Sequence, residues 1–438
     1  MLAPAPLGAR GMFYALVRTL LRFALRCFYR IELAGPALPL EGPLLLVGNH
    51  PNALIDPALL IAVSPRPLTL LAKAPLFRMP VLGALVRGLG ALPVVRAQDG
   101  AAPRGSNTEA LQAAERGLAS GRAVALFPEG RSHSEPALGS LKTGAARLAL
   151  GAGVPVKVVP VGLTYADKGR FRSRVHVEFG PALEVGPGPS TPEAVHGLTE
   201  RIAEALGRLT LNLASWEDLP LIQAAESLYV LATGAPVRDA ERERLFARGL
   251  TLIRAEQPRR AAQLQGEVLA LQRRLALTRA EASDLGLRYR PAGVARFILR
   301  NLFAVVVGLP LALVGLAVFG PPTLLLHSLL RWRHTEEDMA ATVKLLVALV
   351  LGPLYVALIA VGVWKLAGPA WAGVWVLGAL PLGLFTRRFF ARRAVALADA
   401  RVFFRLGNRS ATKRELQETA RDLAGRISAV AEKLRPRL

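Results

Sequence analysis

A histidine and an aspartate that could handle a proton together stand near the start of the chain, in the stretch VGNHPNALIDPALLIAV at residues 48–64. The apolar run that leads into this stretch is typical of a buried strand, and Pro51 breaks it directly after His50. A neutral histidine at a strand end can accept a proton from a hydroxyl group, and a carboxylate can orient the imidazole. Asp56 is the nearest carboxylate. The pair therefore predicts general-base catalysis.

Asp56 also has a structural interpretation. An aspartate followed by Pro57 and the run ALLIAV is typical of a helix N-cap with proline at the first helical position. On an unbroken helix, six positions would place His50 and Asp56 on nearly opposite faces. Because Pro51 favours a turn over residues 50–55, the two side chains can meet. A cap and an orienting carboxylate are compatible roles, and both remain open.

Two further segments place polar residues just after predicted strands. FPEGRS, at residues 127–132, sets Glu129, Gly130 and Arg131 side by side, and GALPVVR, at residues 90–96, ends on an arginine. Glycine lets backbone amides approach an anion, and an arginine fork binds phosphate through two hydrogen bonds. The alternatives are a polar surface turn for the first segment and an ordinary exposed arginine, Arg96, for the second.

The elements that must position these residues alternate between strands and helices. Strands are predicted at 43–49, 68–73, 91–96, 122–128, 155–165 and 174–180, and helices at 57–63, 80–88, 107–120 and 143–151. This alternation indicates an α/β sheet domain that is largely parallel in its core. Ligands of such sheets bind beyond the carboxyl ends of the strands, where His50, Arg96 and Glu129 are expected.

The chain is both basic and apolar, with 52% hydrophobic residues and a formal net charge of +23. Residues 9–33 are predicted to form one helix on which Arg18, Arg22, Arg26 and Arg30 make a cationic stripe. Such a helix suits a membrane surface, and the alternative is a core helix with a solvated arginine face. The basic residues mostly flank apolar helices, so a membrane partner is favoured over nucleic acid.

Three later runs lack Asp, Glu, Lys and Arg, and each is long enough to cross a bilayer: 301–330, 345–364 and 366–386. Buried soluble helices are the alternative. Pro310, Pro321 and Pro322 interrupt the first run, so we expect it to kink or re-enter rather than cross once. The other two runs would form a hairpin that turns near Gly368–Pro369, with the catalytic domain and the basic tail both cytoplasmic.

These observations divide the chain into five parts: an amphipathic membrane-associated helix (1–33), an α/β catalytic domain (34–212), a helical insertion or cap (213–295), a transmembrane region (296–386) and a basic amphipathic tail (387–438). Several chemistries lack sequence support. The chain contains no G-x-S-x-G elbow, P-loop, G-x-G-x-x-G or H-E-x-x-H motif, and Cys27 is its one cysteine. We therefore expect no metal and no covalent serine mechanism.

Four segments, taken in order, resemble the glycerolipid acyltransferase family: NHPNALID, GALPVVR, FPEGRS and VPVGL, the last at residues 159–163. The resemblance covers roughly residues 40–185. FPEGRSHSEPALGSLKTG is most similar to the glycerol-3-phosphate/dihydroxyacetone-phosphate branch, in which an FPEG segment leads to a Leu-Lys-x-Gly step. The family usually separates its histidine and aspartate by four residues, and here five residues intervene. This departure makes Asp56 a less direct match than His50.

The resemblance implies a glycerolipid-acyltransferase-like sheet domain flanked by helices, and a fatty acyl transfer without cofactor. The acyl donor would be acyl-CoA or acyl-carrier protein. The acceptor would be glycerol-3-phosphate or dihydroxyacetone phosphate, with lysophosphatidate as the alternative and a non-catalytic membrane interaction protein as a lower one. His50 would be the base and Asp56 its partner. The remaining site residues would be Lys73, Arg96, Glu129, Gly130, Arg131 and Ser132 around the acceptor, and Pro160 beside the acyl chain.

Overall fold

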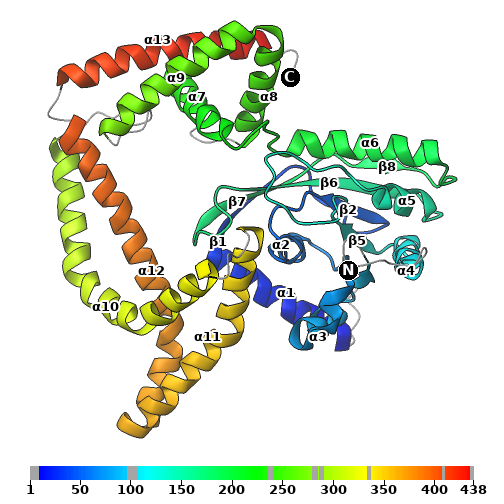
Figure 1. Ribbon diagram of the computed structural model, residues 1–438. Helices are drawn as coiled ribbons and strands as arrows, with labels where there is room; N and C mark the ends of the chain where they lie inside the picture. The colour runs from blue at the N-terminus through cyan, green and yellow to red at the C-terminus, as the bar shows by residue number, and fades with distance from the viewer. Residues whose placement is uncertain are drawn as a thin grey trace, which may run out of the picture. The chain divides into compact units, whose positions relative to one another are not determined.

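The computed structural model describes residues 9–95, 107–234, 240–278, 285, 291–332, 337–406 and 410–434. The chain separates into two compact units (Figure 1). Unit 1 comprises Met1–Asn212 together with Glu336–Leu345, and unit 2 comprises Leu213–Thr335 together with Leu346–Leu438. A short segment from residues 336–345 therefore belongs to the same unit as His50, Asp56 and the FPEGRS segment.

Unit 1 is built on an eight-stranded sheet in the order β1-β7-β6-β2-β5-β3-β4, with β8 paired to β6. The strands are β1 (Tyr29–Ala34), β2 (Leu44–Gly48), β3 (Leu68–Lys73), β4 (Leu92–Val94), β5 (Ala123–Leu126), β6 (Val156–Tyr165), β7 (Ser173–Phe179) and β8 (Leu183–Val185). β2 runs parallel to β5 and β6, and β3 runs parallel to β4 and β5. The predicted α/β fold with a largely parallel core is confirmed, and β1 and β8 are additions to the six predicted strands.

Helices cover both faces of this sheet. α1 (Ala9–Phe28) and α2 (Ile55–Val63) share a hydrophobic core with one face, and α4 (Thr108–Ala119), α5 (Gly144–Gly151) and α6 (Pro192–Leu209) share a core with the other. The 3₁₀ turn Ala74–Arg78 and α3 (Pro80–Gly88) connect β3 to β4. Every residue of β2 and of β5 is buried, as expected for central parallel strands covered on both faces.

The N-terminal helix is shorter than the sequence indicates. It ends at Phe28, and Tyr29–Ala34 form β1, which pairs in parallel with β7. The prediction of one helix over residues 9–33 is therefore wrong at its C-terminal end. The segment YRIELA alternates apolar and polar residues, and β7 offers it a strand edge, so tertiary pairing outweighs helical periodicity there. Arg30 consequently leaves the cationic stripe of α1.

Unit 2 contains a bundle assembled from two distant parts of the chain: α7 (Asp218–Thr233), α8 (Ala240–Glu256), α9 (Pro258–Thr278) and α13 (Ser410–Leu434). Arg426 Nη1 lies 2.6 Å from a carboxylate oxygen of Glu267, which joins α13 to α9. Arg254 donates two hydrogen bonds to Asp218, at 2.7 and 2.8 Å, and thereby lowers the pKa of that carboxyl group. The helical insertion and the basic tail thus belong to one bundle.

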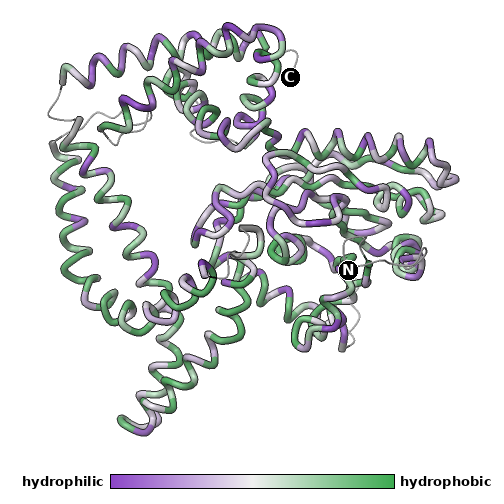
Figure 2. Tube along the Cα trace, viewed as in Figure 1, coloured by the Kyte–Doolittle hydropathy of each residue, from purple (hydrophilic) through white to green (hydrophobic). Residues whose placement is uncertain are grey.

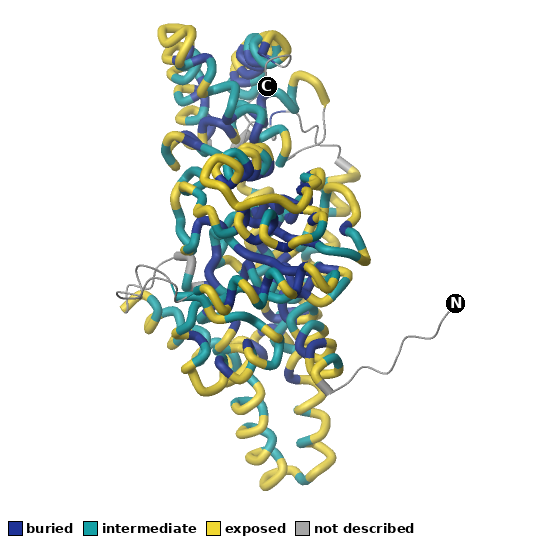
Figure 3. Tube along the Cα trace, turned by 90° about the vertical axis from the view of Figure 1, so that its right-hand side faces the viewer, coloured by how far each residue is buried: buried dark blue, intermediate teal, exposed yellow. Residues whose placement is uncertain are grey.

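Three helices are long and apolar enough to cross a membrane: α10 (Pro291–Trp332), α11 (Glu337–Ala367) and α12 (Pro369–Leu406). Most residues of α10 and α11 and of the first half of α12 are apolar (Figure 2), and many of these apolar residues are exposed (Figure 3). Pro310, Pro321 and Pro322 all lie inside α10, which is one bent helix and not a broken one (Figure 1). α11 and α12 meet at Gly368, where φ is +91°, so the chain turns where the sequence predicts.

Candidate active site

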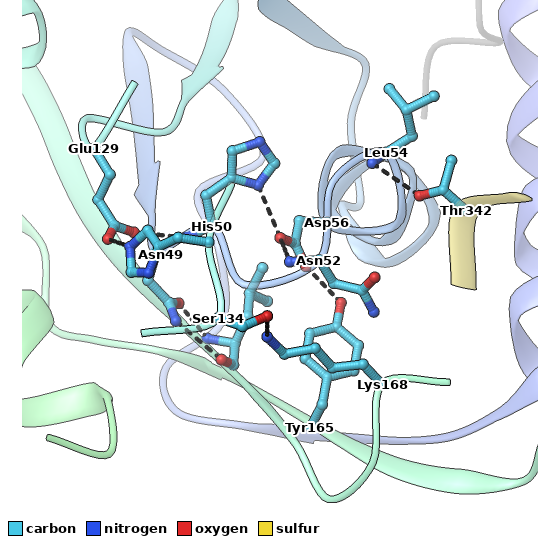
Figure 4. Close-up of polar contacts among 12 residues, drawn as sticks. Asn49, His50, Asn52, Leu54, Asp56, Glu129, Ser134, Tyr165, Lys168 and Thr342 are labelled. Atoms are coloured by element: carbon cyan, nitrogen blue, oxygen red, sulfur yellow. Dashed lines mark hydrogen bonds and ion pairs between the residues drawn. The ribbon is translucent and has the colours of Figure 1, made fainter. Parts of the chain in front are cut away.

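The carboxyl ends of β2, β3, β4, β5 and β6 meet at one edge of the sheet, because these strands are mutually parallel. His50 follows β2 by two residues, and its Nδ1 lies 2.8 Å from Asp56 Oδ2 (Figure 4). The His50 ring stacks on Phe127, with 4.1 Å between ring centroids. The side chain of His50 is 17% exposed and that of Asp56 is fully buried. This arrangement leaves His50 Nε2 as the ring nitrogen that can accept a proton from solvent or substrate.

Asp56 is held by three donors rather than by the histidine alone. The backbone N–H of Asn52 donates to Oδ2 at 2.6 Å, and the Tyr165 hydroxyl donates to Oδ1 at 2.6 Å (Figure 4). Burial raises the pKa of Tyr165 well above its usual value, and the nearby Asp56 charge raises it further. The phenol therefore stays protonated and keeps donating. Tyr165 was missed by the sequence reasoning, since the only available signal is its position at the end of a predicted strand.

The turn between His50 and Asp56 is tight and unusual. α2 begins at Ile55, so Asp56 is inside the first turn of the helix and its carboxylate makes no cap; Leu54 is the N-cap residue. The predicted N-cap role of Asp56 is therefore wrong, while its contact with His50 is present. Ala53 has φ of +29°, a conformation that residues other than glycine rarely adopt. This turn accommodates the fifth intervening residue.

Glu129 ties the FPEGRS segment to the backbone of His50. Its side chain is buried, and Oε1 accepts a hydrogen bond from the His50 N–H at 2.8 Å (Figure 4). Oε2 accepts one from Gly139 N–H at 2.8 Å. The His133 ring also contacts Oε2. Both carboxylate oxygens are thus engaged within the protein, which fits a positioning role better than direct contact with a substrate.

The neighbours of Glu129 differ in exposure. Gly130 has φ of +73°, and a Cβ there would lie 2.9 Å from Lys142 Cε, so the site favours glycine. Arg131 is exposed, with one guanidinium nitrogen 3.8 Å from the Glu135 carboxylate. Ser132 is half-buried in the same segment. Arg131 is therefore the most exposed of these three neighbours of Glu129.

Three predicted site residues come from other strands. Lys73 is the half-buried last residue of β3, at the same sheet edge as His50. Pro160 is buried within β6 opposite Val47, and its carbonyl accepts a hydrogen bond from Gly180 N–H at 2.8 Å. Arg96 lies outside the described residues. Among the residues that the structure does describe, no three His, Cys, Asp or Glu side chains are grouped as metal ligands.

The first half of the chain is similar in sequence to known acyltransferases. Residues 30–164 match the acyltransferase family model. Glycerol-3-phosphate O-acyltransferase 2 of Saccharomyces cerevisiae is 37% identical over 134 residues, which cover 28% of this chain and 18% of the yeast protein. An uncharacterized acyltransferase of Schizosaccharomyces pombe is 26% identical over 288 residues, covering 44% of this chain and 43% of its own length.

Among solved structures, the 1-acyl-sn-glycerophosphate acyltransferase of Thermotoga maritima aligns with 45% of this chain and 78% of its own, at 22% identity and a TM-score of 0.35. The chain spans less than half the length of both fungal relatives. The matched segment contains β1 to β6, the His50–Asp56 pair and the FPEGRS segment. The part of this chain that is similar to acyltransferases is thus the part that carries most of the sheet and the candidate site.

Proposed function

We propose that this protein transfers a fatty acyl group from the thioester of acyl-CoA or acyl-carrier protein to a hydroxyl group of glycerol-3-phosphate. The observation that carries the proposal is His50 held through Nδ1 by the buried carboxylate of Asp56, with Nε2 left available at the open edge of the sheet. The family match over residues 30–164 and the names of the yeast relatives support the same reaction class.

The proposed chemistry needs one base. His50 Nε2 accepts the proton of the acceptor hydroxyl as its oxygen attacks the thioester carbonyl carbon. Asp56 stabilises the imidazolium cation, and Tyr165 and the Asn52 N–H keep the carboxylate in place. When the tetrahedral intermediate collapses, the carbon–sulfur bond breaks and the imidazolium returns the proton to the thiolate. The ester and the free thiol are the products.

The acceptor phosphate would bind beside His50. The Arg131 guanidinium would bind the phosphate through two hydrogen bonds, and the backbone at Gly130 would approach the phosphate closely. Lys73 and Arg96 would add positive charge from the neighbouring strand ends. Ser132 would offer a hydroxyl to the same ligand. Glu129 keeps the FPEGRS segment beside His50 by accepting the hydrogen bond of the His50 N–H. Pro160 would shape the wall beside the acyl chain.

Glycerol-3-phosphate should be a better acceptor than lysophosphatidate. Two observations favour it: the FPEGRSHSEPALGSLKTG segment and the relatives named glycerol-3-phosphate O-acyltransferases, which are 36–37% identical over the matched region. Purified protein would be given labelled acyl-CoA with glycerol-3-phosphate, dihydroxyacetone phosphate or lysophosphatidate in parallel. A higher kcat/KM for lysophosphatidate would assign the alternative function, and the absence of transfer to all three would reject acyl transfer.

We further propose that the protein is held in the cytoplasmic membrane, with the sheet domain of unit 1 and the basic C-terminal helix α13 on the cytoplasmic side, where the donor thioesters are. The exposed apolar side chains of Met12, Leu16 and Leu20 on α1 support contact with the lipid surface. Contacts inside each unit support an even number of crossings. The first turns of α11 pack in unit 1, and α13 packs on α7 and α9 in unit 2.

These contacts suggest which helix crosses. Among the described residues, the candidate spans are α10, α11 and α12, so the chain before α10, the start of α11 and α13 would share one side of the membrane. α10 would then enter and return on that side, as its bend allows, and α11 and α12 would form the single hairpin that crosses.

Cysteine labelling tests this topology. In a Cys27→Ser background, single cysteines would replace Arg331 at the end of α10, Leu366 beside the hairpin turn and Gly425 in α13, all of which are exposed. We expect a membrane-impermeant reagent to label only Leu366→Cys in intact cells, and all three after permeabilisation. Labelling of Gly425→Cys or Arg331→Cys in intact cells would contradict the even number of crossings.

A further inference from the structure

The first turns of α11 are built into the core of unit 1. Ala341 and Thr342 are 0% and 2% exposed, and Ala341 and Leu345 belong to the same hydrophobic cluster as Ile55 of α2. Lys344 Nζ also donates a hydrogen bond to the carbonyl of Gly169, between β6 and β7, at 2.9 Å. The start of this candidate membrane helix is therefore anchored to the catalytic sheet by both apolar and polar contacts.

Thr342 reaches the turn that separates His50 from Asp56. Its Oγ1 accepts a hydrogen bond from the backbone N–H of Leu54 at 3.2 Å, across 288 positions of sequence (Figure 4). Leu54 is the N-cap residue of α2, and the first N–H groups of a helix have no acceptor within the helix. Thr342 thus provides an acceptor that the local sequence does not.

The bond matters because the turn is strained. Ala53, with φ of +29°, directly precedes Leu54, and such conformations persist only where the surroundings hold them. On the other side of Ala53, the Asn52 N–H bonds Asp56 and the Asn52 amide bonds the Tyr29 hydroxyl. On the Leu54 side, the N–H groups of Ile55 and Asp56 bond the Asn52 carbonyl across the turn, and Thr342 adds the side-chain acceptor for the Leu54 N–H itself.

We propose that Thr342 is a positioning residue for the His50–Asp56 pair, acting through Leu54 and the turn at residues 51–54. This inference rests on the proposed acyl transfer. Thr342 touches none of the reacting atoms, so its loss should loosen the turn and displace Asp56 relative to His50 without altering the substrate contacts. Since Thr342 lies in the first turn of the candidate membrane span Ala341–Ala367, the same side chain links that span to the geometry of the base.

The test compares Thr342→Val, which keeps the side-chain shape but removes the acceptor, with Thr342→Ser, which restores it. The full-length protein would be reconstituted in lipid vesicles. We expect Thr342→Val to lower kcat about 10-fold with both KM values unchanged, since small misplacements of catalytic groups cost this much or more. Thr342→Ser should recover most of kcat. Thr386→Val is the matched control, because Thr386 is also buried but its hydroxyl donates to the Leu382 carbonyl within α12.

Hydrogen exchange gives a readout that does not require activity. Loss of the Leu54 bond should speed amide exchange over residues 52–56 by roughly fivefold in Thr342→Val and not in Thr386→Val. Unchanged exchange, or a Thr342→Ser variant as impaired as Thr342→Val, would overturn the inference. If the wild-type protein transfers no acyl group, the proposed function fails, and the exchange measurement alone decides the role of Thr342.

Discussion

Replacing His50 with alanine should lower the rate of acyl transfer by about 10² to 10⁴-fold, the range typical for loss of a general base. The protein should still fold, because the bonds that hold this segment use the His50 backbone. Its N–H donates to Glu129, and its carbonyl accepts from the His133 N–H at 3.1 Å. Both survive in His50→Ala. The measurement is the initial rate of labelled ester formation at saturating donor and acceptor.

A matched control is available in α6. His196 is exposed and lies 3.2 Å from the Glu200 carboxylate, far in sequence from the sheet edge that carries His50. His196→Ala should keep full activity. Circular dichroism and vesicle flotation would show that both variants are folded and membrane-bound. A His50→Ala enzyme that turns over within threefold of the wild type would rule out His50 as the base.

Replacing Asp56 with asparagine should reduce the rate by a similar factor, about 10² to 10⁴-fold, through the orientation of the histidine. Asp56 accepts from Asn52 N–H and from the Tyr165 hydroxyl, and its Oδ2 also faces His50 Nδ1. An amide has one acceptor oxygen, so its NH₂ group must face one of these partners. At the Oδ1 position the NH₂ meets the Tyr165 hydroxyl, which can accept, and the rate falls because a neutral amide does not stabilise the imidazolium cation. At the Oδ2 position it opposes the Asn52 N–H and donates to His50 Nδ1, which places the ring proton on Nε2 and removes the base.

Two comparisons separate catalysis from stability for this residue. Asp167→Asn changes an exposed carboxylate that accepts a local bond from Gly169 N–H and makes no contact with His50, and the rate should stay within about twofold of the wild type. Thermal unfolding of Asp56→Asn would report the cost of disturbing the buried network. Because we assign the lost activity of Asp56→Asn to the chemical step, kcat should fall by a much larger factor than the KM for the donor rises. Full activity in Asp56→Asn would show that His50 works without a carboxylate partner.

Local sequence patterns were sufficient for much of the fold. Residues 44–48 and 123–126 are continuous apolar runs bounded by turn residues, and such runs are buried whatever surrounds them. The three uncharged segments were also predictable as long helices. A turn at Gly368–Pro369 was predictable because glycine readily adopts a positive φ and proline cannot continue the preceding helix. The pairing of His50 with Asp56 was predictable because Pro51 prevents the helix that would separate them.

Only the tertiary structure decided which distant groups meet. Tyr29–Ala34 is a strand because β7 lies beside it, although the arginine spacing alone favours a helix. Glu129 bonds the His50 backbone because β2 and β5 are parallel neighbours, and that pairing is a property of the sheet order. Tyr165 and Thr342 reach the same short turn from 109 and 288 positions away. A hydrogen bond needs two groups within about 3 Å, and local propensity constrains the backbone near each group but not the distance between them.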